Sequence, residues 1–130
     1  MKRRTFILMT LAAAASISCP IKHNKPNSIL VRDPLIWPET LGELTDEKTI
    51  REIGLYYQKI LPSLYEKEKL HRLLLSDSDG TRVAPHNNIA LRDWLRRKTQ
   101  QDFLTYKTIT VNGWVIANTE FRQCALFSFL

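Results

Sequence analysis

The chain has 130 residues, with 44% hydrophobic and 25% charged side chains, and these values fit one compact domain and are too small for two. The formal net charge is +6, but Lys2, Arg3 and Arg4 supply three of the 19 basic residues. The remainder carries 16 basic and 13 acidic side chains, a net charge of +3. Because this balance is only mildly basic, the composition does not favour nucleic acid as a partner.

The first 18 residues contain the three parts of an export signal. A basic start is followed by an apolar run from Phe6 to Ala15 and then by small residues up to Ser18. The apolar run has ten residues, whereas a helix that spans a bilayer needs about 20. We therefore predict a signal peptide over residues 1–18.

The arginine pair indicates the type of signal. Arg3 and Arg4 are followed by Thr5, the aromatic Phe6 and the apolar Ile7, an order that resembles the twin-arginine motif. The alternative is an ordinary secretory signal that contains two arginines. The resemblance implies that the twin-arginine translocation machinery is a partner. It also implies a location in the periplasm or, membrane-anchored, on the outer side of the cytoplasmic membrane.

Cys19 follows three residues, 16–18, of which two are serine, and this arrangement resembles a lipoprotein box. Lipidation of Cys19 would tether the protein to a membrane. Ser16 stands where the box usually has an apolar residue. The alternatives are cleavage without lipidation and, in an oxidising compartment, a disulfide between Cys19 and Cys124.

Residues 19–44 are predicted to form a proline-rich tether. Their prolines interrupt helices, and these are Pro20, Pro26, Pro34 and Pro38. The apolar run 29–31 could dock on the following domain or form a short strand.

Residues 45–130 are predicted to form a mainly α domain, in which three to four helices accompany one C-terminal β-hairpin. The first helix runs to about residue 61 with Thr45 or Asp46 as its N-cap. Apolar residues at three- and four-residue steps give it one buried face, namely Ile50, Ile53, Tyr57, Ile60 and Leu61.

Two further helices are expected in the middle of the domain. Ser63 would begin the first of them and form a capping box with Glu66. Its buried side would consist of Leu64, Leu70, Leu73 and Leu74. The second would run from about residue 88 to 103, with its apolar side at Leu91, Trp94, Leu95 and Phe103.

The clearest local pattern lies near the C-terminus. Asn112-Gly113 separates two β-rich runs within residues 106–117, which predicts a hairpin with a type I′ turn. Asn118 or Thr119 would cap a last helix. Because an isolated two-stranded hairpin is marginal in water, it should pack on the helices or on a partner. The candidate residues for packing on a partner are Trp114, Ile116 and Phe121.

No pattern in the chain predicts catalytic chemistry. His71, His86, Asp77 and Asp79 match no spacing of a zinc or calcium site. Cys124 lies in an apolar stretch, as buried cysteines usually do, and no glycine-rich phosphate loop occurs. We therefore predict no catalytic residue, cofactor or metal, and an enzyme is not the favoured interpretation.

One stretch resembles a ligand-binding surface. The basic residues Arg92, Arg96, Arg97 and Lys98 surround Trp94 on the expected helix 88–103. Outside the cytoplasm such a face could bind anionic lipid headgroups, a polyanionic glycan or an acidic partner. The alternative is a solvated helix face, in which Asp93 pairs with Arg97 at four-residue spacing.

Three segments carry a resemblance to known sequences. Residues 102–103, 110–116 and 119–126, together with the signal, resemble a block in small bacterial proteins that have twin-arginine signals and no assigned activity. In size and layout the chain is also similar to small signal-bearing subunits of membrane-bound sugar dehydrogenases.

Two functions are compatible with these features. The first is an exported, non-catalytic accessory subunit of an oxidoreductase-type complex of the cell envelope, in which this chain supplies the export signal to a larger enzyme subunit. The second is a stand-alone envelope lipoprotein that binds an anionic ligand or lipid surface through the basic helix face.

Overall fold

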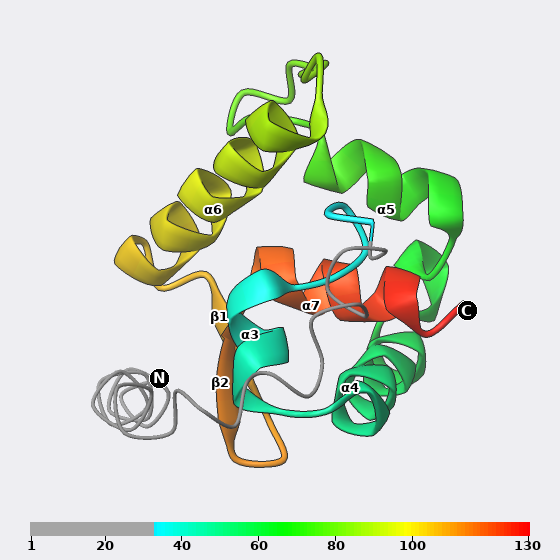
Figure 1. Cartoon of the computed structure of the whole chain (residues 1–130). Helices are drawn as coiled ribbons and strands as arrows, with labels where there is room; N and C mark the ends of the chain where they lie inside the picture. Colours follow the sequence, from blue (N-terminus) through cyan, green and yellow to red (C-terminus); the bar gives the residue numbers. More distant parts are fainter. Residues whose placement is uncertain (1–32) are drawn as a thin grey trace, which may run out of the picture.

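The computed structural model describes residues 33–130 (Figure 1). The predicted signal peptide 1–18, Cys19 and the apolar run 29–31 lie outside the described residues. Within residues 33–130 the chain forms five α-helices, one short 3₁₀ helix and one antiparallel hairpin. This confirms the predicted mainly α domain with a C-terminal hairpin. The elements are α3 Glu39–Leu44, α4 Glu47–Ile60, η2 Pro62–Leu64, α5 Lys67–Leu74, α6 Asn88–Leu104, β1 Thr108–Val111, β2 Trp114–Ala117 and α7 Asn118–Phe127.

Helix α7 is the centre of the fold. It passes through the middle of the molecule, with α4, α5, α6 and the hairpin arranged around it (Figure 1). Its buried residues are Thr119, Glu120, Phe121, Gln123, Cys124, Ala125, Leu126 and Phe127. A helix that is buried nearly all round has no single apolar stripe, so most elements of the domain form the core by packing against α7.

Helix α4 buries the face that its sequence spacing predicts. Ile50, Ile53 and Tyr57 are buried, while Ile60 and Leu61 remain about 38% and 37% exposed. The helix packs on α7 at Gly54, where an added Cβ would overlap the carbonyl oxygen of Cys124. The missing side chain therefore allows the two helices to approach closely.

The N-cap of α4 is Asp46. Its carboxylate accepts a hydrogen bond from the Thr49 backbone N–H at 2.9 Å. Hydrogen bonds from the Thr49 side chain and from this N–H hold the pKa of Asp46 below its ordinary 3.8. The ionised form is therefore the one that caps the helix.

The capping box predicted for the next helix does not form. Residues 62–64 form the 3₁₀ helix η2, and α5 begins only after Glu66, whose side chain makes no capping hydrogen bond. Tyr65 explains the break, because its ring stacks on Phe129 at 4.3 Å and its hydroxyl hydrogen-bonds Ser128 Oγ at 2.7 Å. These contacts hold the Tyr65 backbone outside the helix.

Helix α6 begins where its sequence predicts, since the Asn87 side chain accepts a hydrogen bond from Ala90 N at 2.8 Å. Leu95 is buried, and Trp94 donates from Nε1 to the Leu74 carbonyl oxygen at 2.9 Å. That bond joins α6 to the end of α5.

The hairpin adopts the predicted turn. Asn112 and Gly113 have φ values of 51° and 85°, as a type I′ turn requires. Val111 pairs with Trp114, and the register continues to Thr108 opposite Ala117. The second strand is largely buried against the domain's own helices.

The start of α7 differs from the prediction. Its N-cap is Ala117, not Asn118 or Thr119, and the capping acceptor comes from α6. Asp102 Oδ2 accepts hydrogen bonds from the backbone N and the Oγ1 of Thr119, at 2.8 and 2.6 Å. A carboxylate at a helix N-terminus is stabilised by the helix dipole, so Asp102 fixes α6 to the first turn of α7.

Residues 33–44 were expected to belong to the tether, but they are part of the domain. Leu35 and Leu41 are buried, and Glu39–Leu44 form α3. The prolines explain the error. A proline interrupts a helix interior but is tolerated at a helix start, and Pro38 is the N-cap of α3.

Candidate functional site

The predicted basic face is divided by the geometry of α6. Residues four apart lie on the same side of a helix, and Arg92 and Arg96 both line a cleft between α6, α3 and α7. Arg97 instead has a side chain that is 67% exposed and pairs with Asp93 at 3.3 Å. The four cations therefore do not form one surface.

Lys98 has a structural role. Its Nζ donates to the Ser76 carbonyl oxygen at 2.9 Å and lies 5.9 Å from the centre of the Trp94 ring. Burial lowers the pKa of the Lys98 ammonium, and the nearby Arg122 lowers it further. Lys98 thus connects α6 to the residues that follow α5.

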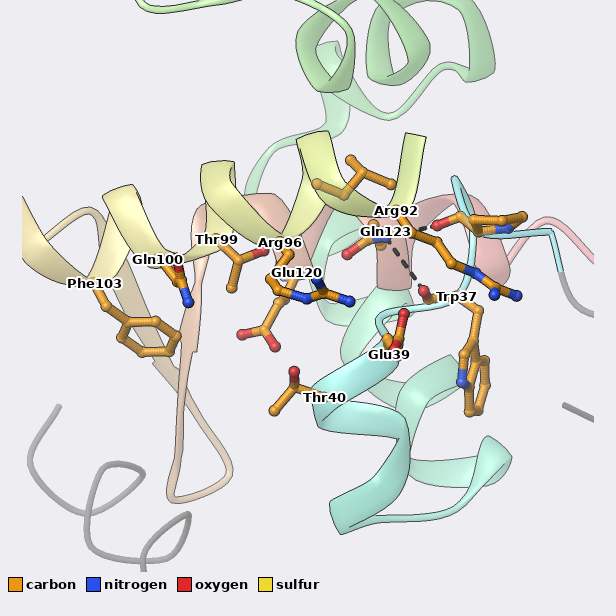
Figure 2. A pocket seen from close by; sticks show the side chains of 12 residues that line it. Trp37, Glu39, Thr40, Arg92, Arg96, Thr99, Gln100, Phe103, Glu120 and Gln123 are labelled. Carbon is orange, nitrogen blue, oxygen red and sulfur yellow. Dashed lines mark hydrogen bonds between the residues drawn. The ribbon is translucent and has the colours of Figure 1, made fainter. Parts of the chain in front are cut away.

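The cleft has a volume of about 270 Å³ (Figure 2). Helix α6 forms one wall and the α3 region the other, while α7 contributes side chains between them. The lining residues are Pro34, Trp37, Glu39, Thr40, Arg92, Leu95, Arg96, Thr99, Gln100, Phe103, Glu120 and Gln123. They combine aromatic, charged and amide groups, as small-ligand pockets commonly do.

Arg92 is the most available cation of the cleft. Among residues 33–130, no hydrogen bond or ion pair engages its guanidinium. Arg96 lies 3.9 Å from an Asp93 oxygen, and both side chains are more than half exposed. An exposed pair of this kind contributes little. Both guanidinium groups can therefore reorient towards a ligand at low cost.

Two glutamates belong to the same cleft. Glu39 is exposed on α3, whereas Glu120 on α7 is only 2% exposed. Glu120 Oε1 accepts a hydrogen bond from the Ala117 backbone N at 3.1 Å. In Figure 2 both carboxylates lie below the α6 ribbon, on the same side as the guanidinium groups of Arg92 and Arg96. The charges are thus supplied by different elements.

The α3 wall is fastened by a buried amide. Gln123 is 3% exposed, and its Nε2 donates to the carbonyl oxygens of Pro34 and Trp37 at 3.1 and 3.3 Å (Figure 2). Backbone carbonyls buried in this way need a donor. The Gln123 amide therefore holds residues 34–37 against α7.

Aromatic rings stand at opposite ends of the cleft in Figure 2, Trp37 at one and Phe103 at the other. The Trp37 ring meets Phe127 edge to face at 5.2 Å. Gly42 leaves room for the indole, since an added Cβ there would overlap it. Trp37 is therefore held in place by packing and is a rigid part of the wall.

The histidines and turn carboxylates do not converge. Asp77 Oδ1 accepts hydrogen bonds from the backbone N–H groups of Asp79 and Thr81, both at 2.9 Å. This is the geometry of a turn. Across residues 33–130, no group of three histidine, cysteine or acidic side chains is arranged to hold a metal ion. In the same range, no helix is both long and apolar enough to cross a membrane.

The residues considered for packing on a partner are mostly used within the domain. Ile116 is fully buried and Phe121 is 3% exposed, with its ring 4.7 Å from that of Tyr57. Trp114 is partly buried against the same core. The hairpin therefore finds its packing surface on this chain's own helices, and Ile116 and Phe121 do not form an exposed patch.

Comparisons of the chain with known protein families, characterised proteins and solved structures find no match. The interpretation of the cleft therefore depends on its own geometry.

Half of the residues that line the cleft lie in segments where the sequence predicted no site. Trp37, Glu39 and Thr40 fall in the segment that was interpreted as a tether, and Glu120 and Gln123 fall in the last helix. One signal was present. Glu120 and Gln123 are long polar side chains three residues apart in an otherwise apolar helix, so they lie on the same side of it. Such a pair indicates that this side of the helix faces polar groups.

Proposed function

We propose that this protein is an exported, non-catalytic binding protein that holds a small anionic ligand in the cleft between α3, α6 and α7. One observation carries the proposal. Arg92 and Arg96 line the same small cleft, and within residues 33–130 nothing pairs with the Arg92 guanidinium.

The chemistry of arginine supports an anion. The planar guanidinium donates two parallel hydrogen bonds to a carboxylate or phosphate, and two such groups one helical turn apart can hold the same ligand. The cleft volume of about 270 Å³ lies below the usual range of roughly 300–1,000 Å³ for ligand pockets. The proposed ligand is therefore one small molecule.

The proposed location follows from the N-terminal sequence. Arg3, Arg4 and Phe6 resemble a twin-arginine signal, and Cys19 is a candidate lipid attachment site. We accordingly place the protein in the periplasm or on the outer side of the cytoplasmic membrane. The protein would then bind its ligand outside the cytoplasm.

A second candidate function is the accessory subunit of an envelope complex. The observation in its favour is a set of apolar side chains on the second half of α4 that remain exposed, namely Leu55 at 46% and Tyr56 and Ile60 at 38% each. Exposed apolar patches often mark binding surfaces. If a partner covers them, Tyr56→Lys should abolish an envelope complex that survives Gln58→Lys on the same helix.

Binding titrations of the full-length chain test the main proposal. Inorganic phosphate and butyrate serve as probes, and NMR chemical shifts report weak binding. Arg92→Gln should weaken at least one probe about tenfold or more, a loss of about 1.4 kcal/mol. The matched control is Arg97→Gln, because it removes one positive charge from the same helix outside the cleft.

Two results would contradict the proposal. One is the absence of saturable binding for phosphate and for every small carboxylate that is tested. The other is equal weakening by the cleft variant and by Arg97→Gln, since that would mean that the general charge of α6, and not the cleft, attracts the anion.

A further inference from the structure

The cleft carries charges of both signs on separate elements. Its basic residues, Arg92 and Arg96, belong to α6, and its acidic residues, Glu39 and Glu120, belong to α3 and α7. Two formal positive charges thus stand beside two formal negative ones. A ligand with only negative charge would be attracted by one wall and repelled by the other.

Glu39 carries the negative charge at the rim of the cleft. Its carboxylate belongs to an exposed residue of α3, whereas Glu120 is 2% exposed and its Oε1 accepts the Ala117 backbone N–H. A ligand that ends in a cation would be stabilised beside Glu39 by the opposite charge.

We infer that the ligand is a small zwitterion, which carries a carboxylate for Arg92 and Arg96 and a protonated amine for Glu39. The inference rests on the proposed function and names the substrate class for the same cleft. It deepens the anion proposal because the acidic wall discriminates against a simple anion.

The size and remaining chemistry of the cleft agree with an amino-acid-sized molecule. Its volume of about 270 Å³ admits one small ligand. Thr40, Thr99 and Gln100 also line the cleft and offer uncharged hydrogen-bonding groups. These groups suit the polar body of such a ligand.

A set of four-carbon probes tests separately the contributions of the ligand's carboxylate and of its amine to binding. Butyrate carries only the carboxylate and butylamine only the amine, while 2-aminobutyrate and 4-aminobutyrate carry both at a short and a longer separation. Titration of the full-length chain, followed by NMR, should show at least one aminobutyrate binding tenfold or more tightly than butyrate. Butylamine should bind more weakly than that aminobutyrate.

Variants of α3 test which side chain binds the amine of the ligand. Glu39→Gln should reduce the preference for the aminobutyrate over butyrate at least threefold, because it removes one carboxylate from the cleft. Glu43→Gln is the matched control, since Glu43 is exposed on the same helix and does not line the cleft. Both positions are exposed, so the fold should tolerate either change.

The outcomes distinguish this inference from the proposed function. If butyrate binds as tightly as both aminobutyrates, or if Glu39→Gln and Glu43→Gln have the same effect, the zwitterion is excluded and a simple anion site remains. If none of the four probes nor phosphate binds, both proposals fail.

Discussion

Tyr106 occupies a backbone conformation that usually belongs to glycine. Its φ is 59°, and it follows the C-cap of α6, where Lys107 N donates to the Asp102 carbonyl oxygen at 2.8 Å and Tyr106 N to that of Phe103 at 3.4 Å. This is a Schellman motif, whose left-handed position strongly favours glycine. The Tyr106 side chain is 72% exposed, so packing compensates little for the strain.

Tyr106→Gly should therefore stabilise the protein. A left-handed residue with a side chain costs about 1–2 kcal/mol, and the added flexibility of glycine in the unfolded chain offsets part of the gain. We expect an increase of about 0.5–1 kcal/mol in the free energy of unfolding, measured by urea denaturation. Lys107→Gly, at the next position, should lower it. A lower stability for Tyr106→Gly would mean that the ring makes contacts that outweigh the strain.

Gly54→Ala should lower the free energy of unfolding, although alanine is a better helix former than glycine by about 1 kcal/mol. Its methyl group would overlap the Cys124 carbonyl oxygen, so α4 and α7 would have to move apart. Such overpacking typically costs about 1–3 kcal/mol. Gln58→Ala, at an exposed position of α4, is the control and should change stability by less than about 0.5 kcal/mol. Equal stabilities of the two variants would show that the helix contact tolerates a methyl group.

At the scale of elements, the first turn of α7 depends on a side chain from α6. The two bonds from Thr119 to Asp102 are buried, and a buried donor without a partner costs about 1–3 kcal/mol. The contact therefore couples two helices that are separated in sequence by the whole hairpin.

Asp102→Leu should destabilise the protein by roughly the cost of the two donors that it leaves unpaired, about 1–3 kcal/mol for each. Thr119→Val removes the hydroxyl, so the double variant should be less destabilised than the sum of the two single variants. Urea denaturation of the four proteins forms a double-mutant cycle. Simple additivity would show that the carboxylate does not act through Thr119.

The sequence predicted those elements whose signals are local. Asn112-Gly113 determines its turn through the φ values of two adjacent residues, and Asn87 caps α6 within one turn of the chain. The cap of α7 could not be predicted in this way, because Asp102 lies 17 residues before Thr119. The assignment of residues 33–44 to the tether was wrong for a related reason. Pro38 is compatible with an interruption and with a helix start, and only the burial of Leu41 distinguishes the two.

The same limit applies to the candidate site. Arg92 and Arg96 could be selected from sequence because basic residues at helical spacing form a local pattern. Their division from Arg97 and Lys98 depends on which side of α6 faces α3. The α3 wall depends on contacts over still longer separations, for example the 86 positions that separate Trp37 from Gln123.

For the molecule as a whole, the cleft exists because residues 33–44 fold back onto α7. Gln123 makes the hydrogen bonds that hold this segment, and Trp37 packs against Phe127. Binding in the cleft and docking of the segment are therefore linked, since a ligand that contacts α3 stabilises its docked position.

Gln123→Glu should loosen this wall. The substitution replaces an amide donor by a carboxylate that faces the carbonyl oxygens of Pro34 and Trp37. Hydrogen exchange should show a larger loss of amide protection in α3 than in α4 and α6, and affinity for the probes of the cleft should fall. Gln101→Glu, the same change at an exposed position of α6 that does not line the cleft, is the control. Uniform loss of protection in all helices would mean that Gln123 stabilises the entire core and not the wall alone.

The central position of α7 also determines when the protein can fold during its synthesis. Helices α3 to α6 and both strands are translated before α7, yet α7 is the helix on which most of them pack. A nascent chain that ends before residue 118 therefore exposes the apolar faces of α4 and α5, and chaperones bind such surfaces. If residues 1–18 are the predicted export signal, a translocase that accepts only folded cargo would have to wait for the ribosome to complete α7, long after that segment has emerged.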